Sequence, residues 1–110
     1  MKILLDENLP KKLKVNFGPH HEIYTVGDMG WNGKKNGELL GLMVFSGFEG
    51  FVTIDKNLQH QQNIAKFPLK IFVLDALNNK IDTLKPFVEM LNEVLKRESE
   101  VQVVLVSLDQ

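Results

Sequence analysis

Four acidic residues of this chain stand where strands are expected to end or a helix to begin: Asp6, Glu7, Glu38 and Asp55. Asp6 and Glu7 follow the apolar run of residues 3–5, and Asp55 follows that of residues 51–54. Because the carboxyl ends of parallel strands form the edge of a sheet where ligands bind, these side chains are expected to gather there. Carboxylates held together repel one another unless a cation joins them. Oxygen ligands in a chain without cysteine favour Mg²⁺ or Mn²⁺ over zinc, so the pattern predicts metal-assisted phosphodiester chemistry.

Asp6, Glu38 and Asp55 are the predicted metal ligands and catalytic residues, and the first two have a plain structural alternative. Asp6 could cap the helix that follows it, although Asn8 is better placed to do so. Glu38 is expected in the first turn of a helix, where the helix dipole favours a carboxylate without any function. Glu7 and Asn8 are secondary candidates, and Glu7 could either bind the metal or pair with a lysine four residues later.

Other residues near these acids could contact a phosphodiester substrate or its metal. Three lysines could neutralise phosphates: Lys34, Lys35 and Lys56. Lys56 could instead pair with its neighbour Asp55. Thr53 lies two residues before Asp55 on the same face of the strand, so its hydroxyl could orient a ligand or a water. Asp28 lies in a loop flanked by glycine and is a secondary candidate, although turn chemistry alone would explain it.

An aromatic residue and a histidine could also contact a substrate. Trp31 lies among glycine and asparagine residues, where it could stack on a base or, as is more common, anchor the loop on the core. His20 and His21 are consecutive, so on a strand they face opposite ways and cannot bind one ion together. His60 stands within the amide-rich run of residues 59–63 and is interpreted as a surface or substrate contact.

The composition is that of an ordinary globular protein. The 110 residues are expected to form one domain, residues 1–110, that is large enough to bury a core. The absence of cysteine excludes a disulfide framework and a thiolate metal site. The net charge of −1 does not by itself indicate a nucleic-acid binder. The opening apolar run ends at Asp6 and no run approaches about 18 apolar residues, so a cytoplasmic protein without a membrane span is expected.

Short apolar runs alternate with helical patterns along the chain. Strands are predicted over residues 3–6, 22–26, 51–55, 71–74 and 101–106. Helices are predicted over residues 9–17, 36–46, 57–65 and 82–95. Asn8 and Pro10 are suited to begin the first helix, and Gly47 is suited to end the second. This alternation predicts an α/β fold, a three-layer α/β/α sandwich with a mostly parallel five-stranded sheet, but it does not fix the strand order.

Four segments of the chain resemble one known family. They are ILLDENLP at residues 3–10, HEIYTVGDMG at 21–30, NGELL at 36–40 and VTIDKN at 52–57. In this order they are similar to the DUF5615 family of PIN-like proteins, small relatives of the PIN-domain nucleases. The opening octet followed by a Thr-x-Asp-Lys motif is the specific part of the resemblance, which extends over residues 2–75.

The resemblance implies a PIN-like fold and an acidic pocket for Mg²⁺ or Mn²⁺. It also implies an endoribonuclease that acts on RNA as the toxin of a toxin–antitoxin pair, with a small antitoxin protein as partner. Asp6, Glu38 and Asp55 match the acidic positions of the family. Asn36 and Asn57 stand where the family often has aspartate, which lowers the charge of the site and its expected metal affinity. The alternative is a weakened or inactive module that binds RNA or a partner protein.

Two further interpretations stay open. Acids at the ends of the first and third strands also suit a receiver-like phosphoacceptor domain. By resemblance, such a domain needs a hydroxyl after its fourth strand and a lysine after its fifth, whereas this chain has Asp75 and the run of residues 104–106 there. The apolar content of the last helix and strand would suit a homodimer, and it would equally suit packing within one chain.

Overall fold

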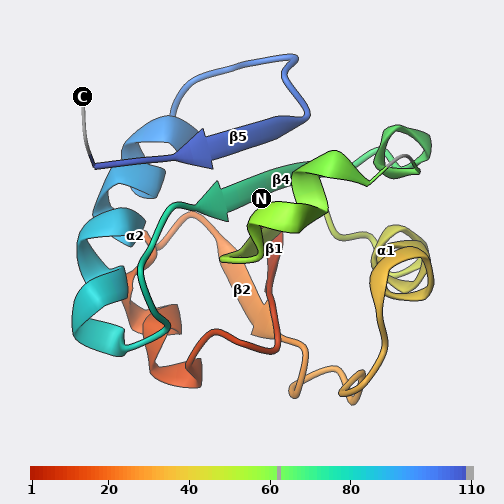
Figure 1. Cartoon of the computed structure of the whole chain (residues 1–110), viewed down its shortest axis with the longest axis horizontal. Coiled ribbons are helices and arrows are strands. Elements are labelled where there is room, and N and C mark those ends of the chain that lie inside the picture. The colour runs from red at the N-terminus through yellow and green to blue at the C-terminus, as the bar shows by residue number, and fades with distance from the viewer. Residues whose placement is uncertain (62, 109–110) are drawn as a thin grey trace.

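The computed structural model describes residues 1–61 and 63–108, which fold around a sheet of five parallel strands (Figure 1). The strands lie in the order β2-β1-β3-β4-β5. Their bounds are Lys2–Leu5 for β1, Glu22–Thr25 for β2, Gly50–Thr53 for β3, Lys70–Leu74 for β4 and Val103–Val106 for β5. The predicted α/β fold with a five-stranded sheet is confirmed, and each neighbouring pair of strands is parallel.

Helical segments connect the strands and cover both faces of the sheet. Their bounds are Lys11–Asn16 for η1, Asn36–Phe45 for α1, Lys56–His60 for η2, Ile64–Lys66 for η3 and Ile81–Leu95 for α2, where η marks a 3₁₀ helix. Residues of η1 and α2 pack against one face of the sheet, and residues of α1, η2 and η3 pack against the other. Figure 1 shows α1 and α2 on opposite sides of the strands.

The central strands consist mostly of consecutive apolar residues because both of their faces are buried. On the face toward α2, Leu5, Val52 and Phe72 are neighbours in register. On the face toward α1, Leu4 lies beside Phe51. All five side chains are buried. A parallel sheet covered on both faces selects such continuous apolar runs rather than an alternating pattern.

The chain leaves β1 and β3 toward opposite faces of the sheet. After β1 it passes through η1 on the α2 face and returns to β2, whereas after β3 it passes through η2 and η3 on the α1 face and returns to β4. In an open parallel sheet, ligands bind at such a switch point, outside the carboxyl ends of the strands. The fold therefore places the ends of β1 and β3 on either side of a potential crevice.

The crossover from β4 to β5 has the opposite hand from the crossover that precedes it. Both connections step in the same direction along the strand order, but the β3-to-β4 connection crosses the α1 face and α2 crosses the other. Nearly all such crossovers are right-handed, so one of these two departs from the rule. Because of this reversal, α2 packs beside η1, and it covers the face that β1 and β3 share with β4.

Two of the predicted α-helices are wrong. Residues 9–17 form only η1, with Pro10 rather than Asn8 at the N-cap and without a side-chain cap. The segment predicted as one helix over residues 57–65 contains the short helices η2 and η3. Pro10 on one side and Gly18-Pro19 on the other leave few residues for η1. Helix nucleation is costly, so such short pieces close with the tighter 3₁₀ hydrogen bonds.

Several boundaries also differ from the prediction by one or two residues. The strands β1, β2 and β3 end before the predicted residues 6, 26 and 55, so Asp6 and Asp55 lie just beyond their strands. The last strand begins at Val103 rather than at Val101. In the described parts of the chain, no helix combines the length and the apolar character that crossing a membrane requires.

The C-terminal end of α1 is fixed by Gly47, as the sequence predicts. Gly47 has a φ of 82°, in the left-handed region that glycine adopts without strain. Its N–H donates to the carbonyl of Val44, and the N–H of Phe48 donates to the carbonyl of Met43. This pair of hydrogen bonds is the Schellman arrangement, and the Phe48 side chain that follows is buried. The turn directs the chain from α1 into β3.

Replacing Gly47 with alanine should lower the free energy of unfolding by about 1–2 kcal/mol, because alanine would have to adopt the left-handed conformation. Gly41 within α1 is the matched control. A Cβ added there meets nothing within 4 Å beyond the nearby backbone of the helix itself. Alanine at this helical position should raise the free energy by up to about 1 kcal/mol. Urea denaturation measures both values, and destabilisation of equal size at the two positions would contradict this account.

Candidate functional site

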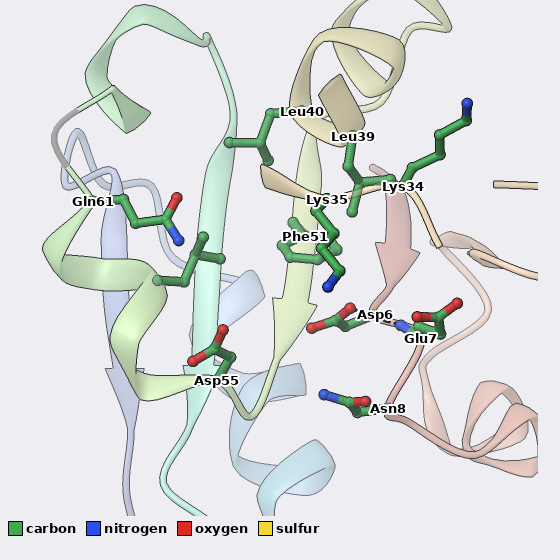
Figure 2. Close-up of a pocket in the computed structure, with 11 residues that line it drawn as sticks. Asp6, Glu7, Asn8, Lys34, Lys35, Leu39, Leu40, Phe51, Asp55 and Gln61 are labelled. Carbon is green, nitrogen blue, oxygen red and sulfur yellow. Dashed lines mark hydrogen bonds between the residues drawn. The ribbon is translucent and has the colours of Figure 1, made fainter. Parts of the chain in front are cut away.

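A pocket of about 430 Å³ opens at the switch point, at the carboxyl ends of β1 and β3 (Figure 2). The loop after β1, the residues before α1 and the segment around η2 supply its polar side chains, and α1, β3 and η2 supply its apolar ones. The residues that line this acidic pocket are Asp6, Glu7, Asn8, Lys34, Lys35, Asp55 and Gln61, together with Leu39, Leu40, Phe51 and Leu58. Two carboxylates from different strand ends, Asp6 and Asp55, therefore face one space.

The side chain of Thr53 connects these two strand ends through hydrogen bonds. This side chain is fully buried, and its hydroxyl donates to Oδ2 of Asp6 at 2.6 Å. The Thr53 hydroxyl oxygen accepts in turn from the backbone N–H of Asp55 at 3.0 Å. Oδ1 of Asp6 accepts from the backbone N–H of Glu7 at 2.7 Å. Thr53 was predicted to orient a ligand or a water, and in the structure it holds the Asp6 carboxylate in place.

The environment of Asp6 raises the pKa of its carboxyl group above the ordinary value. Burial is the largest cause, because removal from water disfavours the charged form. The hydrogen bonds from Thr53 and from the Glu7 backbone lower the pKa in part, whereas the negative charges of Asp55 and Glu7 raise it. The site thus holds a carboxylate whose charge is poorly compensated by the protein, a state that a bound cation would relieve.

Asp55 lies at the opposite rim of the pocket and begins η2. Its Oδ1 accepts from the backbone N–H of Asn57 at 3.0 Å, so the side chain acts as the N-cap of this short helix. Pairing with Asp55 was the alternative role considered for Lys56, but its Nζ lies 2.8 Å from the carboxylate of Asp75, beyond β4. This ion pair ties the ends of β3 and β4 together and leaves the Asp55 side chain in the acidic pocket.

Glu7 and Asn8 line the same pocket but also hold neighbouring loops. Oε1 of Glu7 accepts from the backbone N–H of Gly33 at 2.9 Å, and this contact draws the loop before α1 toward the end of β1. The backbone carbonyl of Asn8 accepts from the side-chain amide of Asn79 at 2.9 Å. In Figure 2 the side chains of Asn8 and Asp6 point in the same direction, toward the side of the pocket where Asp55 lies.

Glu38 is not among the residues that line the acidic pocket. Its carboxylate lies 3.5 Å from Nζ of Lys34, four residues earlier, and its side chain is 63% exposed. Lys34 and Lys35 do line the pocket, at the wall opposite Asp55. Figure 2 shows the Lys35 side chain extending toward Asp6. Of the three predicted ligands, the structure therefore brings together Asp6 and Asp55, and it places Glu38 beside a lysine.

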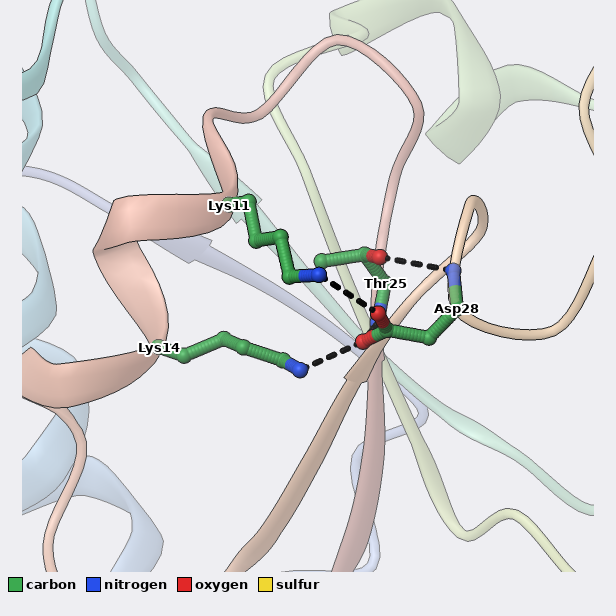
Figure 3. Close-up of polar contacts among 4 residues, drawn as sticks. All are labelled: Lys11, Lys14, Thr25 and Asp28. Carbon is green, nitrogen blue, oxygen red and sulfur yellow. Dashed lines mark hydrogen bonds and ion pairs between the residues drawn. The ribbon is translucent and has the colours of Figure 1, made fainter.

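Asp28 lies outside the acidic pocket, where it joins the loop after β2 to η1 (Figure 3). Its carboxylate pairs with Lys14 and Lys11, and it accepts from the backbone N–H of Thr25. The Thr25 hydroxyl accepts in turn from the N–H of Asp28. The hydrogen bond from Lys14 is the largest cause that lowers the pKa of Asp28 well below its ordinary value. Asp28 therefore stabilises the loop after β2 and does not contribute to the acidic pocket.

The remaining sequence candidates include one residue that packs in the core. Trp31 is half-buried and meets the ring of Phe48 edge-on, with 5.9 Å between the ring centroids. It is thus an anchor of the loop before α1. Asn36 is the first residue of α1, and its side chain lies outside the described part of the structure. Asn57 contributes its backbone N–H to Asp55.

The oxygen-rich lining of the acidic pocket suits a hard divalent cation. Among the described residues, no three side chains of the His, Cys, Asp and Glu types are arranged to hold one ion. Mg²⁺, however, is commonly bound through one or two carboxylates and keeps several of its waters. Asp6 and Asp55 can supply these two carboxylates, with the amide oxygens of Asn8 and Gln61 nearby. Gln61 was not singled out individually from the sequence, although it lies in the amide-rich run.

Comparison of the chain with protein-family models, with curated proteins and with solved structures found no match.

Replacing Thr53 with valine should raise the pKa of Asp6 further, because the hydroxyl that favours its charged form is lost. Titration of the Asp6 carboxyl carbon by NMR measures this change. Thr83→Val, on α2, is the matched control and should leave the Asp6 titration where it is. An unchanged pKa of Asp6 in Thr53→Val would show that the hydroxyl does not hold the carboxylate.

Replacing Asp28 with asparagine should lower the free energy of unfolding by about 1 kcal/mol at neutral pH, since the ion pairs with two lysines are lost. The pKa of Asp28 is lower in the folded chain than in the unfolded chain, so its stabilising effect exists above the unfolded value. The difference between wild type and Asp28→Asn should therefore shrink as the pH falls below about 4. Urea denaturation at several pH values measures it, and a difference that does not change with pH would contradict the ion-pair account.

Proposed function

We propose that this chain is a Mg²⁺- or Mn²⁺-dependent endoribonuclease. The observation that carries the proposal is the position of Asp6 and Asp55 at two strand ends of one pocket, with Lys34 and Lys35 at its other wall. The resemblance to the PIN-like proteins supports the same activity. It adds to the proposal that the enzyme is the toxin of a toxin–antitoxin pair, acts in the cytoplasm and is inhibited by a small antitoxin protein.

The charges of the acidic pocket explain why the proposal needs a cation. Asp6 and Asp55 repel each other and would also repel the phosphate of an RNA backbone. Asp6 and Asp55 would hold a Mg²⁺ or Mn²⁺ ion between these negative groups, and the ion would supply a Lewis acid for water activation and positive charge for the phosphate. Thr53 orients Asp6 for this role, because its hydroxyl holds Oδ2 of the carboxylate while the backbone N–H of Glu7 holds Oδ1. A carboxylate oxygen has more than one lone pair, so each can still bind a cation.

The lysines supply the complementary charge for the substrate. Lys34 and Lys35 line the pocket and can contact non-bridging phosphate oxygens. Lys56 is paired with Asp75 and Lys34 with Glu38, so the charge of each is partly neutralised and their proposed contributions are smaller than that of Lys35. Glu38 is paired with Lys34, which places it at the edge of the site and outside the proposed pair of metal ligands.

One observation favours the second candidate, an inactive module that binds RNA. Lys35 lines the acidic pocket and extends toward Asp6 in Figure 2, and an ammonium group on that wall can attract an RNA phosphate without a metal. A receiver-like phosphoacceptor is less favoured. Asp75 follows β4 where a receiver has a hydroxyl, and β5 ends at Val106.

The nuclease proposal is tested by the Asp6→Asn substitution. Purified wild-type protein should cleave labelled single-stranded RNA only when Mg²⁺ or Mn²⁺ is added, and Asp6→Asn should reduce the rate by about 100-fold or more. Because burial disfavours the charged form of Asp6, the neutral amide should be tolerated by the fold. Calorimetric titration of Mn²⁺ into both proteins should show binding only in the wild type.

Asp82→Asn is the control for that experiment. Asp82 is a carboxylate on α2 that is 94% exposed and lies outside the acidic pocket, so its replacement should change neither cleavage nor Mn²⁺ binding. Metal-dependent cleavage that survives in Asp6→Asn would refute the proposal. RNA binding by the wild type without any cleavage would favour the inactive module.

A further inference from the structure

A second hollow adjoins the acidic pocket and has different chemistry. This side pocket, of about 450 Å³, lies between the start of α1 and the η2–η3 segment. It shares Leu40 and Gln61 with the acidic pocket, so the two spaces are contiguous. Its further lining includes His60, Asn63, Ile64 and Phe67. A ligand bound at Asp6 and Asp55 can therefore extend past Leu40 and Gln61 into the side pocket.

The side pocket combines an apolar floor with uncharged hydrogen-bonding groups. Leu40 and Ile64 are buried, and the ring of Phe67 is half-buried. Asn63 is exposed and occupies the N-cap position of η3, yet its side chain makes no capping hydrogen bond. Gln61 is half-buried beside it. Each amide side chain offers both donors and an acceptor, so the pocket can bind a flat, neutral group along its edge.

The side pocket differs from a phosphate site in the charge of the residues that line it. Among the residues described, neither lysine, arginine, aspartate nor glutamate lines the side pocket, whereas the acidic pocket has two lysines and three acids. A phosphate would find no fixed countercharge here. A nucleobase fits the lining better, because its faces pack on apolar and aromatic groups and its edge forms hydrogen bonds with amides.

We infer that the side pocket binds the base of a nucleotide whose phosphate lies in the acidic pocket. The inference rests on the proposed function for the identity of the polymer, an RNA. The amides of Gln61 and Asn63 read the Watson–Crick edge, and that edge is covered when the base is paired, so the bound RNA is single-stranded. Leu40 and Gln61 mark the passage between phosphate and base.

The test measures binding without catalysis, so it does not depend on nuclease activity. Fluorescence anisotropy in Ca²⁺, a hard cation that can join the carboxylates to a phosphate, is recorded over an interval in which electrophoresis shows the probe intact. It compares three labelled probes: a single-stranded RNA, the same RNA as a duplex, and an abasic oligomer with the same number of phosphates. The double variant His60→Ala/Asn63→Ala alters only residues that line the side pocket and not the acidic pocket. It should weaken binding of the single strand by about tenfold and leave binding of the abasic oligomer unchanged.

The matched control is His20→Ala/Asn32→Ala, which removes an exposed histidine and an exposed asparagine that line neither pocket. It should bind all three probes as the wild type does. The inference is overturned if the wild type prefers the duplex, if it binds the abasic oligomer as well as the RNA, or if His60→Ala/Asn63→Ala binds the single strand normally. Loss of cleavage in every protein, with these binding differences intact, would overturn the nuclease proposal and leave the base site standing.

Discussion

Parallel strands can be joined only by a connection that crosses a face of their sheet, and the rest of this structure follows from where those crossings go. The connection after β1 crosses the α2 face and the connection after β3 crosses the α1 face. Neither connection fills the space between the two strand ends, so a pocket opens there. Asp6 directly follows β1 and Asp55 lies two residues beyond β3. The buried hydroxyl of Thr53 joins them, since it donates to the Asp6 carboxylate and accepts from the backbone N–H of Asp55.

The surroundings of Asp6 disfavour the charged form of its carboxyl group. Burial and the charges of Asp55 and Glu7 raise the pKa of the carboxyl group, so the ionised form costs stability in the folded chain at neutral pH. Protein groups relieve this only in part, through Thr53 and the backbone of Glu7. A site that keeps a poorly compensated charge gains most from a ligand of opposite sign, which makes the acidic pocket a stronger candidate than the surroundings of Asp28, where two lysines already pair with the carboxylate.

Local sequence patterns predicted the features that depend on residues close together in the chain, such as the strands and the residues that follow them. The apolar runs identified all five strands, and the position of Asp6 and Asp55 directly after two of them was sufficient to place both at one edge of the sheet. The patterns could not give the strand order, which depends on contacts between distant segments. They also missed the pairings of Lys56 with Asp75 and of Glu38 with Lys34, because the side chains had several partners within reach. The η1 and η2–η3 segments were mistaken for α-helices, since apolar spacing does not distinguish a short 3₁₀ helix from the first turns of an α-helix.

The reversed crossover through α2 has a consequence for the order in which the chain can fold during synthesis. The face of the sheet that contains Ile3 and Leu5 is covered largely by α2, whose Asn92 side chain also bonds to the backbone of Asn16 and Gly18. A nascent chain that has emerged only as far as β4 therefore exposes this apolar face to water and to other proteins. This face stays uncovered until α2 has left the ribosome, and the chain is most exposed to aggregation before that point.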